Sequence, residues 1–198
     1  RGAGSLLGEQ QSGRIMAVGY DLYCQMVNEA VVEMRGEVPD SPLDLKIEMK
    51  ADAYLPHDYV DSEELRLDAY RKLALVVDDE SLDDLRREWI DRYGPLPVQA
   101  ESLLRIGLLR TLCHRLGLRR VTVQDSTVRL APLRLAPREV EQARQLSAHT
   151  SYDDESLTLR LDVPRNEASL DMLLRVLPEF LRVLPESGRA SAANRAEN

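Results

Sequence analysis

The sequence is poor in the residues that build disulfides and metal sites. Its 198 residues include two cysteines, Cys24 and Cys113, and three histidines, His57, His114 and His149. Two cysteines cannot form a disulfide framework and favour a reducing, cytosolic setting. The histidines follow none of the spacings of metal ligands, such as H-x-x-x-H or H-E-x-x-H, and no C-x-x-C occurs. We therefore expect no metal site.

Long apolar runs are also missing. No stretch approaches the roughly 20 apolar residues of a membrane span, so we expect no membrane association. Residues 1–5 have neither the basic nor the apolar region of a signal peptide, which supports a cytoplasmic location. The chain does not begin with Met, and we expect it to be part of a longer protein.

Motifs that carry catalysis are absent as well. The sequence contains no G-x-S-x-G and no G-x-x-x-x-G-K-[ST], and the G-x-G at Gly2 does not continue to G-x-G-x-x-G. Ser5 and Ser12 lie near glycines, but no histidine can be nominated as a partner. Carboxylates are plentiful, yet general acid catalysis needs one that is desolvated in a pocket. We predict no catalytic residue and no bound cofactor in this chain.

Charge is distributed unevenly along the chain. Hydrophobic residues make up 43% and charged residues 30%, as in a folded globular protein, and the net charge is −8. Residues 61–101 carry a net charge of −6, whereas residues 102–148 hold nine arginines against three acids, a net charge of +6. The acidic balance argues against nonspecific nucleic-acid binding by the chain as a whole. We expect the arginines to pair with the acidic segments, and whether the +6 block binds anything stays open.

The hydrophobic pattern predicts the α+β class, in a single mixed domain of amphipathic helices packed on short strands. We divide the chain into a loop (1–19), a linker helix with a connector (20–43), the α+β domain (44–185) and a disordered tail (186–198). Within the domain we predict strands at 45–55, 121–130 (a hairpin) and 157–163, and helices starting at Asp61 and Ser81 and spanning 97–116, 137–147 and 170–184, the last interrupted or kinked at Pro178.

The stretch 88–97, EWIDRYGPLP, ends one of these helices. Gly94 followed by Pro95 is a signal that one helix stops and another starts. Helical spacing places Leu82, Leu85, Trp89 and Tyr93 on one face, which we expect to be buried. The same spacing places Asp84, Glu88 and Asp91 on the opposite face. The helix therefore presents a candidate acidic surface for a basic partner, although a solvated helix face is the alternative.

Several blocks of sequence resemble a known family. RGAGSLLG at 1–8, QSG at 11–13 and VGYDLY at 18–23 resemble the end of a translocase signature shared by RecG-type helicases and the transcription-repair coupling factors. The continuation is similar to the carboxy-terminal domain of the coupling factors in LP at 55–56, DYV at 58–60, LRL…YRKL at 65–73 and EWIDRYGPLP at 88–97. The resemblance covers residues 1–120 well, and beyond them only the order of elements matches.

This resemblance implies an ATP-dependent translocase on double-stranded DNA that displaces stalled RNA polymerase and recruits nucleotide excision repair. Its ATP and magnesium would be bound by motor domains outside this chain, which itself would not be an enzyme. The residues that match the translocation motif are Arg1, Gly2, Gly4, Gly8, Gln11 and Gly13. Arg and Gln can donate to phosphates or to the motor backbone, and glycines permit close approach.

The resemblance also implies autoinhibition by the carboxy-terminal domain. In the family this domain docks on an amino-terminal module similar to UvrB and masks the surface that binds UvrA. We favour Glu88 and Asp91 as partner-binding residues; Asp84 is a weaker candidate because carboxylates near a helix start also favour the helix dipole. Two alternatives stay open: a stand-alone acidic interaction module with another basic partner, and an unrecognised carboxylate-dependent hydrolase.

Overall fold

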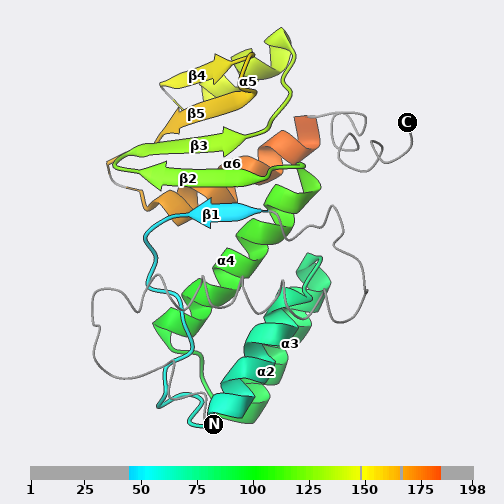
Figure 1. Cartoon of the computed structure of the whole chain (residues 1–198), viewed down its shortest axis with the longest axis vertical. Helices are drawn as coiled ribbons and strands as arrows, with labels where there is room; N and C mark the ends of the chain where they lie inside the picture. The colour runs from blue at the N-terminus through cyan, green and yellow to red at the C-terminus, as the bar shows by residue number, and fades with distance from the viewer. Residues whose placement is uncertain (1–44, 148, 166, 184–198) are drawn as a thin grey trace, which may run out of the picture.

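The computed structural model describes residues 45–147, 149–165 and 167–183 (Figure 1). This part of the chain confirms the predicted α+β class and forms one mixed domain. Its elements, in chain order, are β1 (Lys46–Glu48), α2 (Glu63–Ala74), α3 (Asp79–Tyr93), α4 (Val98–Arg115), β2 (Arg120–Gln124), β3 (Thr127–Ala131), α5 (Pro137–Leu146), β4 (Thr150–Asp153), β5 (Thr158–Asp162) and α6 (Ser169–Val183). The predicted loop 1–19, linker helix 20–43 and tail 186–198 lie outside the described residues.

The strands form a mixed sheet in the order β1-β2-β3-β5-β4. β1 runs parallel to β2, and the other neighbours are antiparallel. Because side chains alternate across a strand, one face of the sheet collects the apolar residues. This inner face carries Ile47, Val121, Val128, Leu130, Leu159 and Leu161, all 5% exposed or less. In Figure 1, α6 and one end of α4 lie behind this sheet.

Helix α4 connects the sheet to the α2–α3 pair (Figure 1). It contacts α2, α3 and α6, and Leu103, Leu104 and Leu109 on it are fully buried. A helix that is apolar on most of its circumference must be covered on most sides, which confirms the buried central helix predicted for 97–116. At Gly107 a Cβ atom would lie 2.7 Å from the Cδ1 atom of Leu73, so a side chain there would interfere with the approach of α2 to α4.

The predicted strand at 45–55 is too long. Only Lys46–Glu48 pair with β2, and the register stops at Thr122. Ala53 and Leu55 are buried as their alternation predicted, but in an irregular segment without a neighbouring strand. The backbone N–H of Leu55 donates instead to the Tyr70 hydroxyl at 3.0 Å. Alternating burial thus arose here from packing onto helices rather than from a sheet.

Both predicted helix starts in the acidic segment were misplaced by a few residues. Ser62, not Asp61, caps α2, its hydroxyl accepting from the N–H of Leu65. Helix α3 begins at Asp79, and the Asp78 carboxylate accepts from the N–H of Ser81 at 2.8 Å. Serine and aspartate both serve as caps, so a cluster of them marks a helix start without selecting the residue.

Later elements agree better with the sequence. The hairpin, the helix from Pro137 and the strand near 157–163 are present, but β4 was missed because Thr150–Asp153 lacks apolar alternation. Helix α6 continues through Pro178, so the predicted interruption is absent. Proline cannot donate a backbone hydrogen bond, but the free energy gained by burying the apolar side chains of α6 exceeds that cost. These side chains are Leu170, Met172, Leu173, Val176, Leu177, Phe180 and Leu181. No helix in the described residues is long and apolar enough to span a membrane.

Replacement of Leu104 by alanine should destabilise the domain strongly. Leu104 is 0% exposed at the centre of α4, so Leu104→Ala leaves a cavity and should cost about 2–5 kcal/mol of unfolding free energy. Urea unfolding followed by the fluorescence of Trp89, the single tryptophan, measures this. Leu75→Ala is the matched control, because Leu75 is 53% exposed and its truncation should cost less than about 0.5 kcal/mol. Equal losses for both variants would contradict the central position of α4.

Candidate partner-docking surface

Helices α2 and α3 form a hairpin at the end of α4 away from the sheet (Figure 1). The short connector between them runs from Leu75 to Asp78. Helix α3 ends at Gly94, whose φ of +88° is a conformation that L residues rarely adopt and whose N–H donates to the carbonyl of Ile90 at 3.0 Å. The predicted glycine stop is therefore confirmed, and it fixes where the acidic helix ends.

The inner face of α3 is buried as predicted. Leu82, Leu85 and Trp89 are 5%, 6% and 1% exposed, and Tyr93 packs half-buried at the edge of the core. The Tyr59 hydroxyl lies 3.1 Å from the carbonyl oxygens of both Trp89 and Gly94, within donating distance of each. The Tyr59 ring meets the Tyr93 ring edge to face. These contacts hold the end of α3 in place and leave only its opposite face for a partner.

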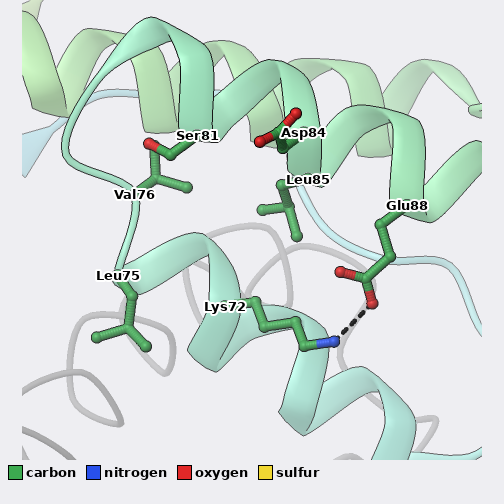
Figure 2. A pocket seen from close by; sticks show the side chains of 7 residues that line it. All are labelled: Lys72, Leu75, Val76, Ser81, Asp84, Leu85 and Glu88. Atoms are coloured by element: carbon green, nitrogen blue, oxygen red, sulfur yellow. Dashed lines mark hydrogen bonds and ion pairs between the residues drawn. The ribbon is translucent and has the colours of Figure 1, made fainter.

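On that opposite face, Glu88 already has cationic neighbours from its own domain. Its Oε1 atom accepts from the Nζ of Lys72 on α2 at 2.5 Å (Figure 2). The same atom accepts from the Nη1 of Arg92 at 2.8 Å. These hydrogen bonds, that from Lys72 foremost, lower the pKa of the Glu88 carboxyl, and burial opposes them. Glu88 is thus ionised at neutral pH and links α2 to α3 by an ion pair.

The other two predicted carboxylates are in different situations. Asp84 pairs with Arg87 one helical turn away at 2.8 Å, and its side chain is 65% exposed. Asp91 is exposed and makes no ion pair with any described residue. The three acids therefore share a face, as the spacing predicted, but Asp91 alone among them has its charge unneutralised within the described chain.

A hollow lies beside these acids, between α2 and α3 (Figure 2). It encloses about 300 Å³ and is lined by Lys72, Leu75, Val76, Ser81, Asp84, Leu85 and Glu88. Leu75 in its lining is 53% exposed, and Val77, which follows the lining residue Val76 in the chain, is 71% exposed. They are two of the four large exposed hydrophobic residues of the described chain. We call the lining residues together with Val77 and Asp91 the docking surface. It combines an apolar centre with acidic and basic side chains around it, as protein interfaces do.

The chemistry of the hollow differs from that of an active site. A general acid needs a raised pKa, and the pKa of Glu88 is lowered. No group of three or more potential metal ligands occurs among the described residues. Cys113 is buried, which raises its pKa, whereas its neighbour His114 is exposed, so the two do not converge.

Sequence reasoning missed part of the docking surface. Lys72 lies 16 residues from Glu88, and no local spacing links them. The run Leu75-Val76-Val77 could have indicated this surface, because it adds more apolar residues directly after a helix than the buried face of that helix needs. The residues of the predicted translocation motif, Arg1, Gly2, Gly4, Gly8, Gln11 and Gly13, lie outside the described residues.

Comparison with known proteins gives one consistent result. Residues 49–142 match the model of the TRCF domain family. The chain is 36% identical over 177 residues to the transcription-repair-coupling factor of Mycobacterium tuberculosis, covering 83% of the chain and 14% of that protein. It is 49% identical over 107 residues to that of Staphylococcus haemolyticus, covering 52% of the chain and 9% of that protein. The chain thus spans a small part of the length of these relatives.

The fold is also found in a solved structure. The crystal structure of the C-terminal domain of transcription-repair coupling factor matches with a TM-score of 0.63 and 22% identity, covering 72% of this chain and 94% of that one. At this identity the match concerns the fold. It agrees with the α+β arrangement of helices and mixed sheet described above.

Removal of the Lys72 ammonium should raise the pKa of Glu88 toward its ordinary value of 4.5, because the leading cause of its lowering is the bond from Lys72. A group with a lowered pKa stabilises the fold above its unfolded pKa and loses that contribution as pH falls. Between about pH 5 and 3, the free energy of unfolding of Lys72→Met should therefore fall less than that of the wild type, by less than about 1 kcal/mol.

The pKa of Glu88 can be followed by NMR titration of its side-chain carboxyl carbon. Lys50→Met is the control, because Lys50 is exposed and makes no ion pair with a described residue. An identical Glu88 pKa in Lys72→Met and wild type would show that the α2–α3 ion pair does not persist in solution.

Proposed function

We propose a function for this chain on the premise that it belongs to the transcription-repair coupling factor family and carries the TRCF domain of its members. It acts as a carboxy-terminal regulatory domain without catalysis of its own. The docking surface binds the UvrB-like amino-terminal module of the same protein and masks the surface that binds UvrA. Release accompanies engagement of RNA polymerase by the whole protein, whose motor uses ATP and magnesium to move on double-stranded DNA.

The observation that carries this proposal is the composition of the docking surface. Leu75 and Val77 expose apolar surface that the fold does not bury, and Leu75 lines the hollow together with the carboxylates of Asp84 and Glu88. Exposed apolar side chains next to charges are typical of sites that bind another protein. The acids favour a partner with arginine or lysine at the matching positions.

The ion pairs of the surface suit a contact that must later open. Because Glu88 is already bonded to Lys72 and Arg92, a cation from the partner gains little beyond what it displaces. Asp91 has no such partner among the described residues and offers its full charge. We therefore rank Asp91 ahead of Glu88 as the electrostatic contact. The resulting complex is specific in charge but modest in affinity.

Charge reversal at the acids should open the contact. Glu88→Lys with Asp91→Lys places like charges against a basic partner and should weaken binding to the isolated UvrB-like module by tenfold or more, roughly 1.4 kcal/mol. Titration calorimetry at several salt concentrations measures it, and the wild-type affinity should fall as salt rises. In the whole protein, the same change should increase UvrA binding.

The matched control is Asp154→Lys with Glu155→Lys. These residues are exposed in the turn between β4 and β5, far from α3 in the fold, and the change in net charge is the same. An equal loss of affinity in both double variants would mean that the change in net charge, and not the position of the acids on α3, weakens binding. Unchanged UvrA binding in the Glu88/Asp91 variant would refute masking by this surface.

The apolar centre can be tested separately. Val77→Ser should weaken binding to the same module, because a valine buried on docking contributes about 1.5–3 kcal/mol, whereas Val98→Ser should not. Val77 and Val98 are exposed to 71% and 77%, so neither change should lower the melting temperature noticeably. Equal binding by both variants would mean that the partner contacts the acids and not Val77.

A further inference from the structure

The outer face of the sheet presents a second charged surface. Alternation along the strands turns the side chains of Arg120, Arg129 and Arg160 away from the core, and all three residues are exposed. Arg120 lies on β2, Arg129 on the adjacent β3 and Arg160 on β5, the next strand. No described helix covers them. The three arginines form a row across neighbouring strands.

Within this row, two like charges face each other. Arg129 and Arg160 are direct cross-strand partners in the β3–β5 register. Side chains at such positions lie about 5 Å apart, and like charges there destabilise a sheet. The juxtaposition of these two arginines therefore does not stabilise the described fold.

These arginines are neutralised only in part. Arg120 attracts the Glu48 carboxylate and Arg160 attracts that of Asp153, each of which also accepts a hydrogen bond from another residue. None of Arg120, Arg129 and Arg160 forms an ion pair with a described residue, whereas arginines on the helices generally do: Arg86 with Glu101, Arg105 with Asp171 and Arg175 with Glu167. The expected pairing of the +6 block with acidic segments is therefore found for Arg105, whereas Arg120 and Arg129 on the strands make no ion pair with a described residue.

The acids of the same face offset only part of this charge. Glu48 is held by Lys46 at 2.7 Å and accepts a weak bond from the Thr122 hydroxyl. Asp153 accepts from Ser156 in the β4–β5 turn. Asp162 is exposed two residues along β5 from Arg160 and makes no ion pair with a described residue. Local positive charge thus persists in a chain whose net charge is −8.

The other side chains of this face decide between kinds of partner. Those that share the face by alternation are polar, Thr122, Gln124, Thr127, Ser151 and Thr158, and Ala131 is the largest apolar residue among them. A protein interface has an apolar centre, which this face lacks. Contacts to nucleic-acid phosphates come from arginine, threonine, serine and glutamine, and such interfaces are polar and basic. No aromatic side chain is available on the face to stack on single-stranded bases.

We propose that the outer face of the sheet contacts the phosphate backbone of duplex DNA, weakly and without sequence preference. The strands lie about 4.8 Å apart, so the row spans roughly 10 Å, and duplex DNA carries one charge per about 1.7 Å of its axis. Two or three phosphates can therefore be met at once. The acidic remainder of the chain keeps the affinity low.

The test uses the full 198-residue chain and a short fluorescent DNA duplex of random sequence, with anisotropy measured between about 50 and 200 mM salt. Arg129→Gln with Arg160→Gln should weaken binding by about tenfold and lower the slope of log affinity against log salt by about 1.8, since each phosphate contact contributes about 0.9. Arg71→Gln with Arg87→Gln is the control of equal net charge on the α2–α3 hairpin, and it should change affinity less than about twofold.

A stability measurement separates lost binding from misfolding. Arg129→Glu replaces the like-charged pair with an opposite pair, so it should raise the melting temperature while it abolishes DNA binding. Three results would overturn the proposal: no binding by the wild type at the lowest salt, equal losses in both double variants, or stronger binding of a polyglutamate peptide than of DNA. The last would assign the face to an acidic protein.

Discussion

The fold depends on covering helix α4. It packs on α6 toward one end and on the α2–α3 hairpin toward the other, so no single layer can bury it. This requirement turns two chain segments of opposite charge into one domain and sets them at the two ends of the helix (Figure 1). The side chains of each segment that do not pack toward the core are left on the surface. They form the docking surface on one segment and the basic face of the sheet on the other.

The two surfaces differ in how their charges are balanced. On the α2–α3 hairpin, Asp84 and Glu88 meet cations of the same domain, and the apolar side chains of Leu75 and Val77 are exposed. On the sheet the reverse holds: no large apolar residue is exposed, and the arginines of the row form no ion pair with a described residue. Burial drives protein association, whereas unneutralised positive charge drives association with polyanions. The same chain therefore carries two chemically distinct sites.

Patterns of local origin could be predicted from the sequence. Trp89 at a helical interval from Leu85 and Leu82 fixed the buried face of α3, and the Gly94-Pro95 step fixed its end, because both depend on backbone geometry within a few residues. Residues 45–55 show the limit, since alternation records which side chains are buried but not whether a second strand is present. The ion pair of Lys72 with Glu88 and the Arg129–Arg160 register depend on tertiary placement, which no spacing along the chain encodes.

The Lys72–Glu88 pair connects the docking surface to the interior. A partner cation that draws Glu88 away from Lys72 removes a link between α2 and α3 at the same moment that it gains its own. The packing of Leu73 against Gly107 keeps α2 on α4 meanwhile, so the hairpin stays folded while its surface exchanges partners. Because the exchange replaces one exposed ion pair with another, its net free energy is small in either direction. Apolar contact at the hollow must then supply most of the affinity, and the charges decide which partner is accepted.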